Sequence, residues 1–144
     1  MDSKQPRMTV EQFEALWPAE SPFMQIYPFA VEDIGYGTAR VRLPFGEHHV
    51  RPGDTISGPT VMALADYTIW AMVLGMTGPD YLGSATSSLN ANFLRRAALV
   101  DLIAEARIIR LGRRLAVGEA TVYSDGADDP VAHVTATYAV AKQA

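Results

Sequence analysis

The chain contains no cysteine, and this absence excludes three kinds of chemistry. A disulfide framework, a thiolate zinc site and a cysteine nucleophile are all ruled out. Basic residues are also few: 12 Lys and Arg stand against 16 Asp and Glu, for a net charge of −4 and a pI near 5.3. A nucleic-acid binder needs a basic surface that displaces counterions. We therefore expect no nucleic-acid partner.

Long apolar runs are missing as well. The opening residues MDSKQPRMTVEQF contain no apolar core of a signal peptide, and no run reaches the roughly 18 uninterrupted apolar residues of a membrane span. Of the 144 residues, 49% are hydrophobic, which is enough for one core in a chain too short for two ordinary domains. We expect a single domain over residues 1–144, in a cytoplasmic protein with no membrane partner.

Residues 1–22 are predicted to form an N-terminal helical extension. Thr9 suits a helix cap, Gln12 completes a capping box, and Pro18 ends the helix. The apolar positions at helical spacing are Val10, Phe13, Leu16 and Trp17. The next residues, 22–37, show no clear period and are predicted to be a connecting segment with at most a short strand, leading into a strand at TARVRLPF.

The stretch SGPTVMALADYTIW begins a predicted helix over residues 59–74. Its proline suits the first helical turn, and Ser57 or Gly58 can cap it. Gly75 and Gly78 are expected to end it. Nearly every position is apolar, so the helix has no solvent face of useful width. A curved sheet and a neighbouring element are needed to bury it.

Alternation with a period of two predicts four antiparallel strands after the helix: ATSSLNANFL, LIAEARIIRL, LAVGEATVYS and VAHVTATYAV. In the first strand Thr86 falls on the mostly polar face, opposite Ala85 and Leu89. In the last strand Tyr138 falls on the apolar face. Residues 112–114 read as a hairpin turn. One face of the third strand is expected to lie against a bulky element because it carries only small residues, Ala116, Gly118 and Ala120.

Asp66 stands in the middle of the apolar helix. At helical spacing its neighbours on the same face are Met62, Ile69 and Val73. Asp is a weak helix former, and burying an ionised carboxylate costs several kcal/mol unless the group is paired or neutralised. Such a cost is typical of a functional group. A structural acid bonded to hydroxyls or backbone N–H groups would fit the same pattern, so these residues alone leave both interpretations open.

Together SGPTVMALADYTIW, GSATSSLNANFLRRA, ARIIRLGRRLAVGEATVY and PVAHVTATYAV resemble the PaaI-like acyl-CoA thioesterases of the hotdog fold, over roughly residues 35–142. The resemblance implies an α+β fold in which a curved antiparallel sheet wraps a long central helix. It also implies a homodimer, or a tetramer built from two dimers, with the active site between subunits. The implied activity is hydrolysis of an aryl or medium-chain acyl-CoA to the free acid and coenzyme A, without a cofactor.

The resemblance assigns roles to single residues. Asp66 matches the helix carboxylate that activates water or attacks the thioester carbonyl. Gly58 matches the glycine whose N–H polarises the thioester oxygen, and Thr86 matches a hydroxyl that positions the water. Arg51 stands where the family often has an Asn, and can either polarise the carbonyl or pair with Asp66. Ser57 replaces the usual histidine before the glycine and is expected at the substrate.

The resemblance also implies that basic residues at surface edges bind the phosphates of coenzyme A, and four arginines fit this role because a guanidinium group binds phosphate bidentately. They are Arg95, Arg96, Arg113 and Arg114. Two other functions stay open. One is a non-catalytic protein that binds an acyl-CoA, with Arg51 silencing Asp66. The other is a dehydratase with His48 and His49 as acid-base groups, against the plainer interpretation of a surface histidine pair. No spacing of histidines and acids predicts a metal site.

Overall fold

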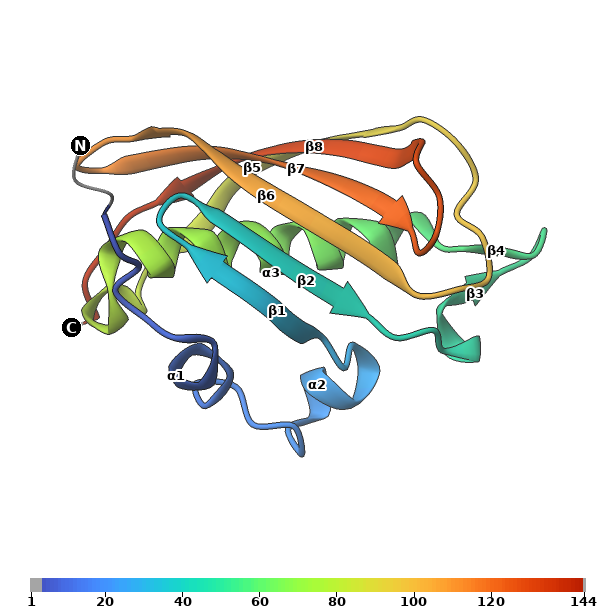
Figure 1. Cartoon of the computed structure of the whole chain (residues 1–144), viewed down its shortest axis with the longest axis horizontal. Helices are drawn as coiled ribbons and strands as arrows, with labels where there is room; N and C mark the ends of the chain where they lie inside the picture. The colour runs from blue at the N-terminus through green and yellow to red at the C-terminus, as the bar shows by residue number, and fades with distance from the viewer. Residues whose placement is uncertain (1–3, 144) are drawn as a thin grey trace.

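The computed structural model describes residues 4–143 and has one long helix packed against a curved, six-stranded antiparallel sheet (Figure 1). The order across the sheet is β1-β2-β6-β7-β8-β5. The strands are β1 (Ala30–Gly35), β2 (Thr38–Leu43), β5 (Ala85–Phe93), β6 (Leu102–Leu111), β7 (Leu115–Ser124) and β8 (Pro130–Ala139). The four strands predicted by alternation are thus confirmed to within one residue at each end. Besides α2 (Pro22–Ile26), the elements not predicted are a small hairpin, β3 (Val50–Arg51) and β4 (Thr55–Ile56), and two short 3₁₀ helices, η1 (Glu47–His49) and η2 (Pro79–Tyr81).

The central helix, α3 (Gly58–Thr77), begins one residue before the predicted start. Ser57 caps it, because its side-chain oxygen accepts a hydrogen bond from the backbone N–H of Thr60 at 3.3 Å. By length and composition α3 could cross a membrane, yet 72% of its most apolar 18-residue window is buried inside this fold. Its apolar character is therefore explained by the core that it fills.

The end of α3 lies beyond the predicted one. Gly75 does not end the helix, so that prediction is wrong. A Cβ at Gly75 would lie 2.7 Å from Cγ2 of Ile34, so glycine is needed there for β1 to pack closely on the helix. Gly78, with a φ of 95°, ends the helix as expected.

The sheet packs closely on α3 through its strip of small residues. A Cβ on Gly118 of β7 would lie 2.6 Å from the terminal methyl carbon of Met72. Ala120 on the same strand and Val134 on β8 are fully buried. The expectation that a bulky element lies against the third predicted strand is therefore confirmed, and that element is α3.

One stripe of α3 is open in the single chain, contrary to the expectation that no face is exposed. Pro59 is exposed and Met62 is 37% exposed. The stripe lies beside β5, since Gly58 approaches Phe93 and Asp66 contacts Thr86. β5 is itself an edge strand with mostly exposed side chains. Helix stripe and strand edge together form one unpaired surface.

The N-terminal segment forms two short helices, α1 (Val10–Glu14) and α2 (Pro22–Ile26). The predicted capping box is confirmed: Thr9 and Gln12 exchange two hydrogen bonds, at 2.9 and 3.1 Å. α2 lies in a region predicted to be a connection, because a five-residue helix is too short to show a period. Figure 1 shows α1 and α2 on the side of the molecule away from β5 and β8.

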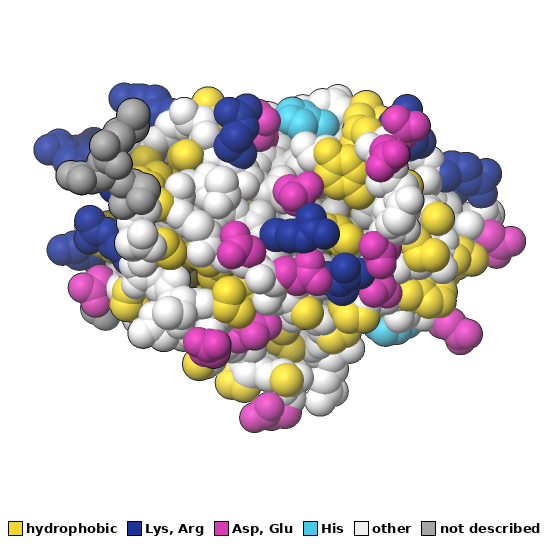
Figure 2. Space-filling model, viewed as in Figure 1, with side chains coloured by type: hydrophobic (Ala, Val, Ile, Leu, Met, Phe, Trp, Pro, Cys, Tyr) yellow, Lys and Arg dark blue, Asp and Glu magenta, His cyan; other side chains and the backbone are white. Residues whose placement is uncertain are grey.

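Charged residues gather on the outer face of the sheet. Figure 2 shows basic and acidic side chains interleaved across its centre. Arg42 is the hub of this cluster and bonds Glu32, Asp101 and Asp125 at 2.7, 3.1 and 2.9 Å. The outer face is thus polar, and the apolar face points to α3.

Candidate active site

Two hydroxyl groups hold the carboxylate of Asp66. The Thr86 hydroxyl donates to Oδ1 of Asp66 at 2.8 Å, and the Tyr138 hydroxyl donates to the same oxygen at 2.6 Å. Tyr138 also lies 3.0 Å from the backbone carbonyl oxygen of Asp66. Within residues 4–143 no hydrogen bond to Oδ2 is found. Both hydroxyls thus hold the carboxylate through the same oxygen, Oδ1.

A β-bulge aims Thr86 at the helix. Thr86 pairs with Tyr138 and Ser88 pairs with Thr137, so Ser87 has no partner on β8. Residues directly opposite one another in an antiparallel pair share a face, so Thr86 and Tyr138 both point to α3. The prediction that Thr86 lies on the polar face is wrong, because the extra residue shifts the alternation along β5 by one.

The Tyr138 hydroxyl is a donor that keeps its proton. Burial raises its pKa well above the ordinary value, and the negative charge of Asp66 raises that pKa further. Tyr138 is 3% exposed. A buried tyrosine hydroxyl needs a polar partner, and Asp66 supplies it. The contact therefore places beside the carboxylate a hydroxyl that donates a hydrogen bond and stays protonated.

A cavity of about 220 Å³ opens next to Asp66. Its walls are mostly aromatic and come from the N-terminal segment, α3 and β8. The lining residues are Trp17, Phe23, Ala63, Asp66, Tyr67, Trp70 and Tyr138. An apolar pocket with one charged group at its wall is the usual form of a small-molecule site.

A second cavity, of about 330 Å³, lies at the start of α3. It brings together four residues predicted from the sequence: Arg51, Gly58, Arg95 and Arg96. Arg95 donates to the backbone carbonyl of Pro130 at 2.7 Å, and Arg96 contacts the carbonyl of Gly53. Within one chain, Arg51 therefore lines the cavity with Gly58 and not the cavity with Asp66.

Gly58 and Asp66 of one chain are too far apart to act on one carbonyl group. Eight residues separate them on α3, which corresponds to about 12 Å along the helix axis. An oxyanion donor and an attacking group each have to lie roughly 3 Å from the same reacting group. Within one chain the two predicted groups therefore do not meet at a single carbonyl.

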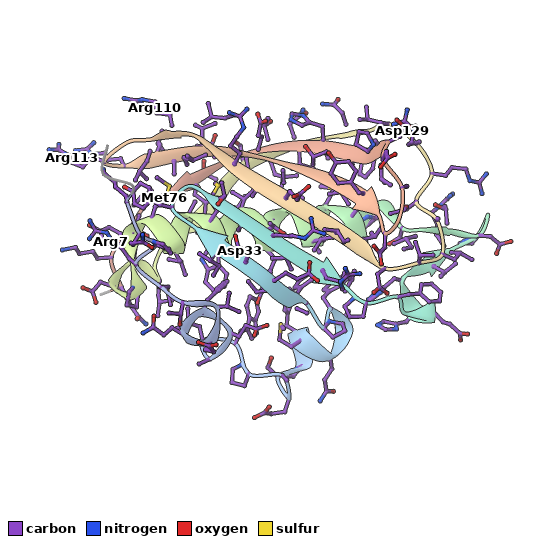
Figure 3. All side chains as sticks on the ribbon, viewed as in Figure 1. Arg7, Asp33, Met76, Arg110, Arg113 and Asp129 are labelled. Carbon is purple, nitrogen blue, oxygen red and sulfur yellow. The ribbon has the colours of Figure 1, made fainter. Side chains whose placement is uncertain are left out.

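The remaining predicted arginines lie elsewhere. Arg113 lines a third cavity, of about 210 Å³, together with Arg7. Figure 3 shows Arg113 and Arg110 at the end of the molecule opposite the one where Asp129 lies and where Figure 1 places the β3–β4 hairpin. Arg114 is exposed in the same hairpin turn. The four arginines predicted to bind phosphate are thus divided between opposite ends of the folded molecule.

His48 and His49 do not line the cavity beside Asp66. Nε2 of each ring contacts the same acceptor, the backbone carbonyl of Ile26 at the end of α2. Burial lowers the pKa of His49 below its ordinary value. The pair therefore fixes the N-terminal segment to the loop before α3. Among the residues described, 4–143, no group of three His, Asp or Glu side chains is arranged to hold a metal.

The cavity residues that were not assigned to the site from the sequence include Tyr138, Trp17 and Phe23. Tyr138 carried one signal, a polar hydroxyl on the apolar face of the last strand. Trp17 belonged to a helical stripe, which predicts packing only. Phe23 lay in a segment without a period. Sequence spacing does not tell which of these side chains meet, because they come from three separate elements.

Known proteins match both the sequence and the structure. The sequence model described as the thioesterase superfamily matches residues 53–130. A candidate thioesterase of Silicibacter sp. TM1040 is similar in structure, with 34% identity, 96% coverage of both chains and a TM-score of 0.84. The phenylacetic acid degradation protein PaaI of Thermus thermophilus, solved as a mutant, has 26% identity, coverage of 83% of this chain and 99% of its own, and a TM-score of 0.72. A candidate esterase of Thermoplasma acidophilum is 27% identical over 65% of this chain and 70% of its own.

Proposed function

Because this chain belongs to the thioesterase superfamily and is a thioester hydrolase of the PaaI-like hotdog type, we propose that it hydrolyses an aryl or medium-chain acyl-CoA. The products are the free acid and coenzyme A. The observation that carries the proposal is the Asp66 carboxylate, held through one oxygen by two hydroxyls at the wall of an apolar cavity. We keep the cytoplasmic location as a prediction.

In the proposed reaction Asp66 acts as a general base through Oδ2. It takes a proton from water while the water oxygen bonds to the thioester carbon, and Thr86 orients that water. The oxyanion that forms accepts a hydrogen bond from the N–H of Gly58. Collapse of the tetrahedral intermediate breaks the C–S bond, and the thiolate of coenzyme A takes up the proton. Tyr138 positions the carboxylate throughout.

The same geometry serves a covalent route. Here Oδ2 of Asp66 bonds to the thioester carbon, the C–S bond breaks, and water then hydrolyses the mixed anhydride. A single turnover in ¹⁸O-labelled water tests for the covalent intermediate. Label on the Asp66 carboxyl group indicates the covalent intermediate, and label only in the product acid indicates general-base catalysis or water attack on the acyl carbon of the anhydride.

We propose that two subunits complete each site. The spacing of Gly58 and Asp66 on one helix supports this proposal, because Gly58 of the same chain is too far from Asp66 to be its oxyanion donor. The unpaired surface formed by the α3 stripe and β5 offers the place, since an edge strand pairs with a second copy of itself. A homodimer then brings the helix start of one subunit to Asp66 of the other. Two such dimers could form a tetramer.

The arginines divide in the same way. Arg51, Arg95 and Arg96 line the same cavity as Gly58. In the proposed dimer, these residues of one subunit therefore lie near the thioester carbonyl that is bound beside Asp66 of the other subunit. We therefore propose that these three, with Ser57 at the helix start, contact coenzyme A near the reacting group. Arg113 and Arg114 stay candidates for phosphate contacts at a more distant edge.

The direct test is release of coenzyme A thiol from benzoyl-CoA and octanoyl-CoA, followed with a thiol-reactive dye. The protein contributes no thiol of its own because it has no cysteine. Asp66→Asn is expected to lower kcat by about 10² or more. Asp33→Asn, which changes an exposed carboxylate on β1, is the matched control and is expected to leave kcat unchanged. Equal rates for parent and Asp66→Asn would remove Asp66 from the mechanism.

The shared site has its own test, by mixing two inactive variants. Gly58→Pro removes the proposed N–H donor at the first position of α3, which accepts proline, and its Cβ would lie 3.4 Å from Cζ of Phe93, an ordinary contact distance. Unfolding the two variants and refolding them together in equal amounts makes about half of the dimers mixed, and each mixed dimer has one of its two sites intact. About a quarter of the parental activity is therefore expected to return. If both residues served a site within one chain, no mixed dimer would be active.

A further inference from the structure

The acyl half of the substrate needs a place of its own, and the cavity beside Asp66 is the place that touches the catalytic group. This inference rests on the proposed function and names the part of the substrate that the cavity selects. Four aromatic side chains form its walls, Trp17 and Phe23 from the N-terminal segment and Tyr67 and Trp70 from α3. The wall opposite α3 is therefore built by the N-terminal segment, which belongs neither to the central helix nor to the sheet.

The rings of this cavity contact one another and fix its shape. Trp17 stacks on Phe23 with ring centroids 4.1 Å apart. Trp17 also meets Trp70 edge to face at 5.8 Å and lies 6.1 Å from Tyr67. Phe13, only 1% exposed, packs behind them against Trp70 at 4.9 Å. Such contacts keep the rings in place without a ligand.

The N-terminal segment is a fixed wall, because it is bonded to the fold at both ends. The carboxylate of Glu14, at the end of α1, accepts a hydrogen bond from the backbone N–H of Val31 on β1 at 3.1 Å. The carbonyl of Ile26, at the end of α2, is contacted by His48 and His49. Trp17 and Phe23 lie between these two anchors and are partly exposed toward the cavity.

The size of the cavity limits what enters. A dry apolar cavity of about 150 Å³ is known to hold benzene. A space of about 220 Å³ therefore takes one ring and its link to the carbonyl group. A long alkyl chain that runs toward Trp17 and Phe23 meets the wall formed by their stacked rings. Aromatic walls also favour an aromatic ring over a saturated ring of equal size, because ring edges and faces attract one another.

We propose that Trp17 and Phe23 form the closed wall of the acyl pocket and restrict the enzyme to thioesters of compact acyl groups, with one aromatic ring preferred. Trp17 and Phe23 are thus specificity-determining residues, supplied by the N-terminal segment. Asp66 lies at the mouth, where the thioester carbonyl of a bound ring would meet it.

Tryptophan fluorescence reports on this pocket directly, because the chain has two tryptophans and both line the cavity. The probes are three non-hydrolysable thioethers: S-benzyl-, S-cyclohexylmethyl- and S-dodecyl-coenzyme A. On the parent protein S-benzyl-coenzyme A is expected to change the fluorescence and to bind about 2- to 10-fold more tightly than the cyclohexyl probe. The dodecyl probe is expected to bind most weakly.

Two variants test the wall. Trp17→Ala and the milder Trp17→Leu are expected to abolish the preference for the benzyl probe and to improve binding of the dodecyl probe by about 10-fold. Trp17→Leu keeps an apolar side chain against Phe23, so it still tests the wall if Trp17→Ala fails to fold. Phe45→Ala, which removes an exposed ring elsewhere, is the control and is expected to keep the parental order. If the parent and the Trp17 variants bound the three probes in the same order of affinity, the proposal would be overturned.

Binding and turnover together separate this inference from the proposed function. Binding in the expected order without release of thiol from benzoyl-CoA would uphold the pocket and overturn the hydrolysis of such esters. Turnover of benzoyl-CoA and dodecanoyl-CoA at equal kcat/KM would uphold the hydrolase and overturn the pocket. Turnover that follows the binding order, and shifts to dodecanoyl-CoA in Trp17→Leu, supports both.

Discussion

Thr86 and Tyr138 lie directly opposite each other on β5 and β8, and their hydroxyls donate to the same oxygen of Asp66. The pairing exists because Ser87 is bulged out of β5. Two donors on Oδ1 fix the rotation of the carboxylate, and in the proposed mechanism Oδ2 is the oxygen that acts on the substrate. This contact forms only when β5 and β8 pair in this register and α3 packs on them at the position that brings Asp66 to the two hydroxyls.

Removing the Tyr138 hydroxyl tests its role as a positioning group. Tyr138→Phe keeps the buried ring but removes one donor to the carboxylate. Such bonds to charged groups are worth about 1.5–3 kcal/mol, so kcat is expected to fall about 10- to 100-fold with KM within about 2-fold. The readout is steady-state thiol release, with Tyr123→Phe on β7 as the matched control.

A double variant separates positioning from general stability. In the Asp66→Asn background, Tyr138→Phe is expected to cause little further loss, because the group that it positions is already gone. A purely structural role would lower the rate by the same factor in both backgrounds. The unfolding midpoint in urea, recorded for all four proteins of the cycle, shows whether the fold is kept.

The bulge at Ser87 predicts unequal effects of two neighbouring hydroxyls. Thr86→Val keeps the shape of the side chain and loses the bond to Asp66, so kcat is expected to fall about 10-fold or more. Thr86→Ser is expected to retain most of the activity. Ser88→Ala is expected to be silent, because Ser88 pairs with Thr137 and points away from α3. Regular alternation would put residues 86 and 88 on one face, so a large effect of Ser88→Ala would argue against the bulge.

The approach of β7 to α3 predicts a cost for any side chain at Gly118. Gly118→Ala forces the terminal methyl of Met72 to move and is expected to lower the free energy of unfolding by about 1–3 kcal/mol. Met72→Leu lacks that methyl group, so the double variant is expected to recover part of the loss. Urea unfolding of the two single variants and the double variant measures this coupling. Additive losses would show that the two residues are not in contact.

His49 predicts a pH dependence of stability. Burial lowers its pKa in the folded protein, whereas the unfolded chain keeps the ordinary value near 6.5. Below about pH 6.5 the unfolded state takes up a proton that the folded state resists, so the free energy of unfolding falls as the pH is lowered through this window. His49→Phe, which can keep the stack on Tyr27, is expected to show a weaker decline.

Unfolding by urea at several pH values between 5 and 7.5 measures this effect. His133→Asn, which removes a half-exposed histidine on β8, is the control and is expected to decline as the parent does. An identical decline for the parent and His49→Phe would assign the pH dependence to other groups.

Local pattern alone predicted much of this fold. Alternation predicted β6 and β7 to the residue, because half-buried strands repeat with a period of two whatever lies beyond them. The capping box at Thr9 and the cap at Ser57 were likewise readable, since each bond spans three residues. Asp66 stood out because a carboxylate is costly in an apolar helix.

Contacts between distant segments were not readable in this way. Gly75 looked like a helix end, because the approach of Ile34 that requires a glycine there comes from another element. The bulge at Ser87 left no mark in the pattern of polar and apolar residues. The predicted arginines separated into two groups because the fold sends their loops to opposite ends.

By itself, the sequence determined the absence of cysteine, a central apolar helix that carries one carboxylate, and the strands that follow it. Those features depend on periodicity, capping and the cost of a charge among apolar residues, all of which act over a few positions. Only the tertiary structure decided that Tyr138 and Thr86 hold Asp66 and that Trp17 and Phe23 line the cavity beside it. Side chains up to 121 positions apart meet there, and the packing of helix, sheet and N-terminal segment alone sets which of them come into contact.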